Sequence, residues 1–183
     1  MTTASAGKSP ILLYGLLFGV ISIVYTVILY LGGVNAYMHP SNKYLGVVIA
    51  VGFAFLTAWQ LRKQQGGYLE FADALKGIFK VMVIGILLST IFDYVLFNYI
   101  DTAFREALRQ ASIDAMIYEM EKSNMPQSKI DQTLEWMEKF NSFGLAAQAL
   151  AFAVRCILHF IIALIVAGIM KKKRPFFENS FNQ

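Results

Sequence analysis

The sequence predicts an all-α, polytopic membrane protein with four transmembrane helices and an extracytoplasmic helical hairpin between the third and the fourth. Four long apolar runs occupy most of the chain, at about residues 10–31, 44–61, 77–100 and 146–170. About 20 apolar residues in a helix cross a hydrocarbon core that is roughly 30 Å thick. In addition, 57% of the 183 residues are hydrophobic and only 15% are charged, whereas soluble domains contain about 25% charged residues. We therefore expect residues 1–183 to form a single four-helix transmembrane domain.

The first apolar run resembles a signal peptide in two respects. Lys8 precedes it, and Val34-Asn35-Ala36 loosely resembles a cleavage site with small residues. However, the run contains about 21 residues, which exceeds the 7–15 apolar residues of a signal peptide. We expect this segment to be a retained membrane anchor.

The basic residues orient the predicted helices. Lys8 precedes the first run, Arg62 and Lys63 follow the second, and residues 171–174 form a basic block after the fourth. The connection at 101–145 instead holds five basic and eight acidic residues. Because Lys and Arg favour the cytoplasmic side, we expect both termini to be cytoplasmic, including the basic tail at 171–183. This placement of charge beside apolar runs argues against nucleic-acid binding, which needs an organised basic surface.

Local signals indicate where the helices begin and end. Pro10 fits the first turn of a helix, where its missing N–H costs little. Gly32-Gly33 should end the first helix, and residues 64–67 (Gln-Gln-Gly-Gly) should form a cytoplasmic turn. The helix that contains the third run should begin near Tyr68, because apolar residues at helical spacing precede the run.

The long connection, residues 101–142, should be an ordered insertion of two helices. Asn124-Met125-Pro126 divides it into segments at 101–123 and 126–141. In the first segment the apolar face changes sides near Ser112, through either a kink or a change of neighbours. The two helices could pack on each other or on the membrane surface, or they could bind a membrane or periplasmic protein partner.

Polar residues inside the runs suggest a contact between the third and fourth helices. Asp93 lies seven residues from the outer end of its run, about 10 Å along a helix, and Arg155 lies nine residues in, about 13 Å. Charged groups inside a membrane usually face the bundle and pair. We therefore predict an intramembrane ion pair between Asp93 and Arg155, with His159, Ser89 and Gln148 as polar neighbours.

Three roles are open for this pair. It could simply fix two helices together, it could belong to a proton or ion pathway through Asp93 and His159, or it could line a ligand pocket. Small residues raise a similar choice in the first run, where Gly15 and Gly19 form a GxxxG pattern that lets helices approach closely. That pattern could serve packing within the bundle or homodimerisation, so the oligomeric state is left open.

The sequence predicts no catalytic, cofactor-binding or metal-binding residues. His39 and His159 are the two histidines, so there is neither an HExxH motif nor a histidine cluster. There is also no P-loop and no GxSxG motif. Since Asp93 is the one carboxylate within the runs, a paired acid–base site inside the membrane is missing too. We expect that the protein is not an enzyme.

The chain resembles the domain-of-unknown-function family 4199, whose members are uncharacterised four-span bacterial membrane proteins of the Bacteroidota type. The resemblance covers nearly the whole chain. It rests on the four-span layout, on the segment 66–77 (GGYLEFADALKG), and on the turn 125–130 (MPQSKI) before the last span. It implies a location in the bacterial inner membrane, but no activity and no functional residues.

Two functions are compatible with these observations. The first is a non-enzymatic membrane protein that serves as a structural or accessory subunit. The second is a small transporter or channel component that uses a polar intramembrane site at Asp93, Arg155 and His159. Both place the protein in the lipid bilayer.

Overall fold

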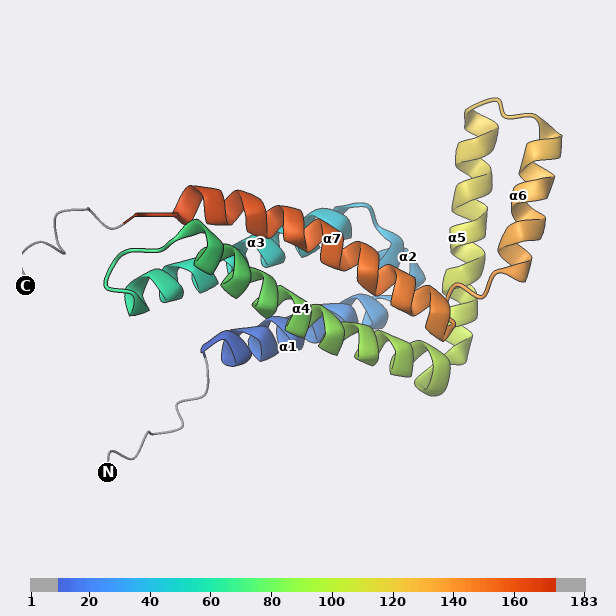
Figure 1. Cartoon of the computed structure of the whole chain (residues 1–183). Helices are drawn as coiled ribbons and strands as arrows, with labels where there is room; N and C mark the ends of the chain where they lie inside the picture. Colours follow the sequence, from blue (N-terminus) through green and yellow to red (C-terminus); the bar gives the residue numbers. More distant parts are fainter. Residues whose placement is uncertain (1–9, 174–183) are drawn as a thin grey trace, which may run out of the picture.

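The computed structural model describes residues 10–173, apart from the side chains of Lys43 and Glu138. Lys8 and the tail from residue 174 onward, both used above to orient the chain, lie outside the described residues. The chain folds into long helices that run side by side, and two further helices stand across one end of them (Figure 1). In order, the elements are α1 (Pro10–Leu31), α2 (Gly33–Met38), α3 (Ser41–Gln64), α4 (Phe71–Val95), the π-helical segment η1 (Leu96–Ile100), α5 (Thr102–Lys122), α6 (Gln127–Lys139) and α7 (Leu145–Met170).

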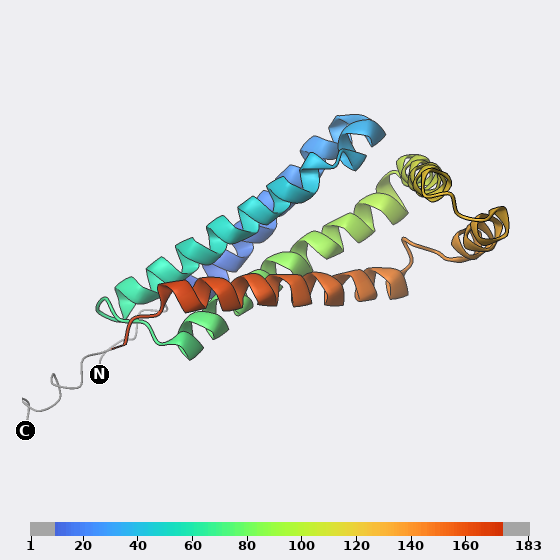
Figure 2. The ribbon, with the colours of Figure 1, turned by 90° about the horizontal axis from the view of Figure 1, so that it is seen from above.

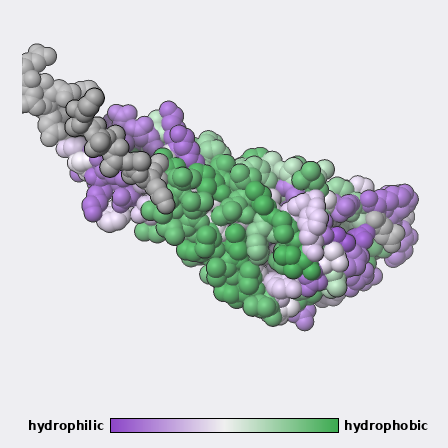
Figure 3. Space-filling model, turned by 90° about the horizontal axis from the view of Figure 1, so that it is seen from below, coloured by the Kyte–Doolittle hydropathy of each residue, from purple (hydrophilic) through white to green (hydrophobic). Residues whose placement is uncertain are grey.

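Four helical stretches are long and apolar enough to cross a membrane. They are Pro10–Leu31, Tyr44–Gln64, Phe71–Ile100 and Leu145–Met170, which agrees with the four predicted runs. One face of the molecule carries a broad hydrophobic band with hydrophilic surface at both ends (Figure 3). The protein is therefore a multi-pass membrane protein with an all-α fold.

Glycine and asparagine residues mark the breaks between helices. α1 ends at Leu31, and Gly33 adopts a φ of +80° as the first residue of α2. The sequence did not predict this short helix. Gly66 and Gly67 have φ values of +69° and +90° in the turn after α3. Asn124 has a φ of +54° between α5 and α6. Positive φ is easy for glycine and tolerated by asparagine, so these residues stop each helix where the sequence suggested.

α4 begins at Phe71, which is later than the expected start near Tyr68 but earlier than the third apolar run. Its first turns keep a buried side, since Ala74 and Ile78 are fully buried. The helix thus extends the span toward the end of the bundle that lies opposite α5 and α6 (Figure 1).

The most extensive contact between helices joins α1 and α4. A Cβ atom added to Gly15 would meet Ile84 Cβ at 2.8 Å, and one added to Gly19 would meet Leu88 Cδ2 at 2.7 Å. A Cβ atom on Gly85 would clash with Phe18. The GxxxG residues of α1 are therefore buried against α4 within one chain, as the bundle-packing interpretation expected.

The hydrophobic core is concentrated at the end of the bundle where α3 and α7 converge. Ala54 and Ala58 of α3 are fully buried in a cluster with Ala163 and Ala167 of α7. Toward the opposite end α3 and α7 diverge (Figure 2), and outer residues of α3 such as Tyr44 and Val48 are exposed. The four long helices therefore form a bundle that is tight at one end and open at the other.

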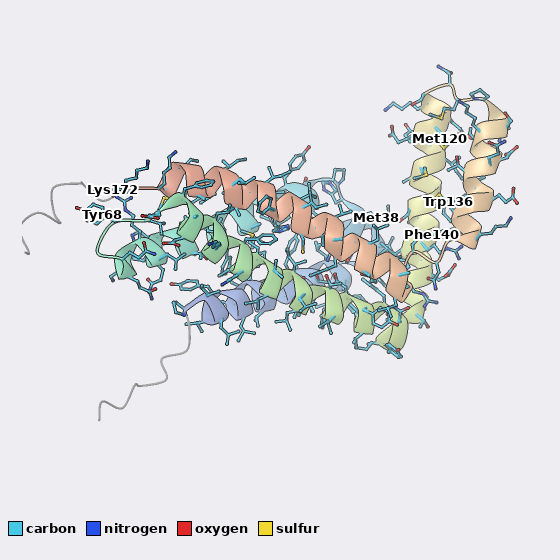
Figure 4. The ribbon with its side chains drawn as sticks, viewed as in Figure 1. Met38, Tyr68, Met120, Trp136, Phe140 and Lys172 are labelled. Carbon is cyan, nitrogen blue, oxygen red and sulfur yellow. The ribbon has the colours of Figure 1, made fainter. Side chains whose placement is uncertain are left out.

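An isolated backbone bridge closes the tight end. The Lys172 N–H donates to the Leu69 carbonyl at 2.8 Å, and the Leu69 N–H donates to the Lys172 carbonyl at 2.9 Å. The Lys172 ammonium also lies 5.6 Å from the centre of the Tyr68 ring (Figure 4). The residues that follow α7 are thus attached to the turn between α3 and α4, which lies at the same end of the bundle as the start of α1 (Figure 1).

α5 and α6, which we call the arm (residues 102–139), project sideways from the other end (Figure 1). Aromatic rings fix the base of the arm: Phe104 of α5 lies 4.8 Å from Tyr30 and 6.1 Å from Phe97, measured between ring centres. Asp101 caps α5 by accepting a hydrogen bond from the Phe104 N–H at 2.8 Å. Its other carboxylate oxygen accepts one from the Tyr30 hydroxyl at 2.7 Å.

α5 passes Ser112 as one helix, and residues on both of its predicted apolar faces are buried. Leu108 is buried with Leu96 and Phe97 at the base of the arm. Ile113, on the other face, is buried as well, and α5 contacts α2, η1 and α6. Each apolar face of α5 therefore has at least one buried residue.

Candidate intramembrane polar site

The end of α4 positions the candidate site. Asp93 lies two residues before the last residue of α4, and the backbone then continues as the π-helical segment η1. A π-helical turn within a helix is rare and often occurs at functional sites. Asn98 of η1 donates to the Phe143 carbonyl at 3.0 Å, so this segment is tied to the residues that precede α7.

The structure brings Asp93 and Arg155 together. Arg155 Nη1 lies 3.3 Å from Asp93 Oδ2, which links α4 to α7. The Asp93 side chain is only 8% exposed, whereas the Arg155 side chain is 43% exposed. The acid is thus enclosed by the bundle, and the base lies at its edge.

Two residues from the first part of the chain complete the surroundings of the carboxylate. Thr26 of α1 lies near Asp93, although no hydrogen bond within 3.5 Å joins its hydroxyl to Asp93 Oδ1. The charges of Asp93 and Arg155 both affect the pKa of Tyr37 in α2. Burial raises the pKa of Tyr37, the Asp93 charge raises it further, and Arg155 acts in the opposite direction. The Tyr37 hydroxyl therefore stays protonated and can donate a hydrogen bond near the ion pair.

The other predicted polar neighbours lie apart from the pair. His159 Nδ1 lies 2.7 Å from the Arg155 carbonyl oxygen, and its ring centre lies 6.1 Å from that of Phe18. The Ser89 hydroxyl donates to the Ile86 carbonyl at 3.0 Å. Gln148 lines a groove on another side of α7. Among the described residues, the hydrogen bonds of His159 and Ser89 do not involve the Asp93 carboxylate.

Several polar atoms at the site have no hydrogen-bond partner. Among the described residues, Asp93 Oδ1 and Thr90 Oγ1 are buried and unpartnered. Only Nη1 of the Arg155 guanidinium makes a hydrogen bond to residues 10–173, although an arginine carries five N–H donors. An unpartnered buried polar group costs about 1–3 kcal/mol, and more if it is charged. The site therefore retains unused binding capacity on both the acid and the base.

Two grooves flank the half of α7 that is nearer to the arm. One has a volume of about 430 Å³ and reaches from Phe140 to Arg155. The other has a volume of about 270 Å³ and lies between α4 and α7, where Thr90 and Gln148 line it. In the part of the chain that the structure describes, no group of three or more His, Cys, Asp or Glu side chains could hold a metal ion.

Sequence reasoning identified the two charged residues but missed the groups around them. Thr26, Tyr37 and Thr90 are ordinary members of apolar or aromatic segments, and their relevance depends on how the helices rotate. The depth of Asp93 in its span was the one signal that could have pointed to these neighbours. Residues near the end of α1 that is closer to the arm, or just beyond it, lie at a similar depth. No sequence pattern predicted η1.

The comparisons with known proteins agree with the structural class and add no activity. A search of curated proteins found no significant match, and a search of solved structures found none either. A family model matches residues 13–172, which include the arm and all four spans apart from the first three residues of α1. The chain belongs to the family described as "Protein of unknown function (DUF4199)".

Proposed function

We propose that the protein is a non-enzymatic accessory subunit that binds a second membrane or extracytoplasmic protein through the arm. One observation carries this proposal: Trp136 of α6 and Phe140, which directly follows α6, form an exposed stacked pair (Figure 4). The ring centres of Trp136 and Phe140 lie 4.9 Å apart at an interplanar angle of 11°, and Trp136 is 60% exposed. An exposed stack of this kind costs solvation free energy unless a partner covers it.

Further residues of the arm have the composition of a protein interface. Met116, Tyr118 and Met125 are all exposed. Aromatic residues and methionine are enriched where proteins bind one another, and binding energy tends to concentrate on Trp and Tyr. The arm therefore offers both a central anchor and surrounding contacts.

The charge of the arm favours a protein partner over a lipid surface. Residues 102–139 contain seven acidic and five basic residues. Helices that lie on membranes are usually rich in Lys and Arg, which attract anionic lipids. The acidic excess instead suits a partner that presents a basic rim around an apolar pocket.

The proposal includes an orientation in the bacterial inner membrane, with both termini in the cytoplasm and the arm outside. Its support is the distribution of basic residues. Arg62, Lys63 and Lys171–Lys173 gather at the end opposite the arm, as the positive-inside rule expects for a cytoplasmic end. Lys63 lies over the Trp59 ring at 5.6 Å, which suits an interfacial position.

The two tryptophans of the chain provide a matched test. Trp136 lies on the arm and is 60% exposed, and Trp59 lies near the inner end of α3 and is 55% exposed. A stoichiometric partner retained in mild detergent should be lost with Trp136→Ala and kept with Trp59→Ala. A partner that survives Trp136→Ala with unchanged yield would contradict the proposal.

Fluorescence quenching separates a protein partner from the membrane surface. Brominated lipids should quench Trp59 strongly in the Trp136→Phe variant, where it is the remaining tryptophan. They should quench Trp136 weakly in the Trp59→Phe variant. Equal quenching would place α6 in the lipid interface and overturn docking to a protein.

A small transporter or channel component is the second candidate function. The unpartnered, buried Asp93 Oδ1 favours it, because a pathway needs a polar group that is free to interact. The test replaces Asp93 by cysteine in a Cys156→Ser background and measures labelling by a water-soluble reagent from each side. Labelling from either side supports a pathway, and protection from both sides supports a structural pair.

A further inference from the structure

The larger groove beside α7 ends at the ion pair. It runs from Phe140 and Ser142, near the outer end of α7, along Ala147, Leu150 and Val154 to Arg155. Its volume of about 430 Å³ falls within the range of roughly 300–1,000 Å³ that is typical of small-molecule sites. Its lining is apolar apart from the two ends, which is also typical of such sites.

Arg155 supplies a cationic group at the deep end of this groove. The guanidinium is half exposed and uses only Nη1 on Asp93 among its described neighbours. Its remaining N–H donors have no protein acceptor in residues 10–173, and hydrocarbon offers them none. The chemistry that satisfies them best is a carboxylate, because two parallel N–H···O bonds fit the arginine fork.

The dimensions of the groove restrict the ligand. From Ala147 to Arg155 the helix advances eight residues, or about 12 Å at the helical rise. The cation lies at the inner limit of the groove, and the apolar wall lies between it and the outer surface. A phospholipid of the outer leaflet has the opposite order, since its charged headgroup stays at the surface. A shorter molecule can enter with its acid group first, so that the acid group reaches the cation at the inner limit and the tail lies along the apolar wall.

The charge balance restricts the ligand as well. Asp93 already offsets Arg155, so a bound monoanion leaves a net charge of one and a dianion such as a phosphate monoester leaves about two. Uncompensated charge inside a membrane is costly, which favours the monoanion.

We propose that this groove is a binding site for an amphipathic monocarboxylate with a single apolar tail. Its carboxylate binds the free edge of the Arg155 guanidinium, and its tail lies along Ala147, Leu150 and Val154. Lipid tails cover the open side of the groove. The groove shares Phe140 with the aromatic pair that the proposed function assigns to a protein partner, but Trp136 does not line it.

Decanoate and decanol test the proposal directly, because they share a tail and differ in charge. The full chain in phosphatidylcholine nanodiscs should bind radiolabelled decanoate saturably, above the background of empty nanodiscs. Decanol should compete at least about tenfold more weakly than unlabelled decanoate does, because it lacks the carboxylate that pairs with the guanidinium. Equal competition by decanol, or no saturable binding above empty nanodiscs, would overturn the site.

Two tryptophan substitutions locate the bound tail. Leu150 lines the groove and is 63% exposed, whereas Ile157 lies outside it and is 61% exposed. Both exposed positions accept a larger side chain without touching the ion pair. Leu150→Trp should weaken decanoate binding about tenfold, and Ile157→Trp should leave it unchanged. If Leu150→Trp binds decanoate as well as the wild type does, the tail does not lie in this groove and the proposal is wrong.

An Arg155→Lys variant tests the fork. Lysine keeps the positive charge but loses the planar geometry that holds a carboxylate with two bonds. Decanoate affinity should fall while far-ultraviolet circular dichroism stays unchanged. Unchanged affinity would show that the carboxylate does not bind the arginine fork, and it would contradict the assigned geometry.

Discussion

Arg155 and Asp93 form an ion pair at 3.3 Å although 62 residues separate them in the sequence. The pair joins α4 to α7 near the open end of the bundle, where α3 no longer packs on α7. It thus supplies a polar link between the two helices close to the aromatic cluster around Leu96 and Phe97.

Removing one member of this pair should destabilise the protein more than removing both. Arg155→Met leaves Asp93 enclosed without its counter-charge, and we expect a loss of about 2 kcal/mol. Breaking a fully buried pair costs roughly 3–5 kcal/mol, and the value is reduced here because Arg155 is half exposed. The double variant Asp93→Asn/Arg155→Met should recover part of the loss, as measured by unfolding in SDS. A double variant that is as unstable as the sum of the two single variants would argue against direct coupling.

Enlarging Gly19 should weaken the contact between α1 and α4. Gly19→Leu would place its side chain against Leu88 and the Gly85 backbone, and overpacking of this kind costs about 1–3 kcal/mol. Gly52 has nothing within 4 Å of an added Cβ, so Gly52→Leu is the matched control and should be neutral. SDS unfolding of the purified variants measures both. Equal stability of the two variants would contradict close packing at Gly19.

Asp101 should make the stability of the arm depend on pH. Its pKa is lowered by the hydrogen bond from the Phe104 N–H and by the one from the Tyr30 hydroxyl. Because the pKa of Asp101 is lower in the folded than in the unfolded state, the ionised carboxylate stabilises the fold. This stabilisation is fully present above the pKa of the unfolded state, about 3.9, and it is lost as the pH falls through the pKa of the folded state. The thermal midpoint of Asp101→Ala should therefore lie below that of the wild type at pH 6, and the gap should narrow toward pH 2. Asp114→Ala, an exposed change on the same helix, serves as the control and should show no such narrowing.

A proline at residue 172 should open the backbone bridge to Leu69. Lys172→Pro removes the N–H that donates to the Leu69 carbonyl, and a net hydrogen bond is worth about 0.5–1.5 kcal/mol. Hydrogen exchange of the Leu69 amide should accelerate, because the remaining half of the bridge holds it less firmly. Lys173→Pro, one residue farther on, should leave that amide protected. Equal exchange in both variants would mean that the bridge contributes nothing to the closure of this end.

The elements of this fold that depend on local chemistry could be predicted from the sequence. The spans follow from the length and hydropathy of the runs, and the helix ends at Gly33, Gly66 and Asn124 follow from residues that tolerate positive φ. The approach of Asp93 to Arg155 followed from depth, since two charges at one level of a membrane gain by meeting. α2 and η1 escaped prediction because their sequences, Gly33–Met38 and Leu96–Ile100, read as an ordinary loop and as a continued helix.

The surroundings of the site depend on information that a single sequence does not contain. Thr26 lies near Asp93 on a helix whose Gly15 and Gly19 fit closely against α4, and that fit involves both helices at once. The arm illustrates the same limit. Ser112 marked a change of face, but only the packed structure shows that Leu108 on one face of α5 and Ile113 on the other are both buried.

The order of synthesis gives the contact between α1 and α4 a further role. A ribosome adds about 5–20 residues per second, so the 62 residues from Asp93 to Arg155 take about 3–12 s at this rate. During that time the acid has no counter-charge, and a lone carboxylate in a bilayer costs about 2.5–3.5 kcal/mol. Thr26 and Tyr37 have already been made by then and lie beside it in the finished fold. We therefore expect an Asp93→Asn substitution, which removes the lone charge during this interval, to raise the yield of inserted protein in an Arg155→Met background.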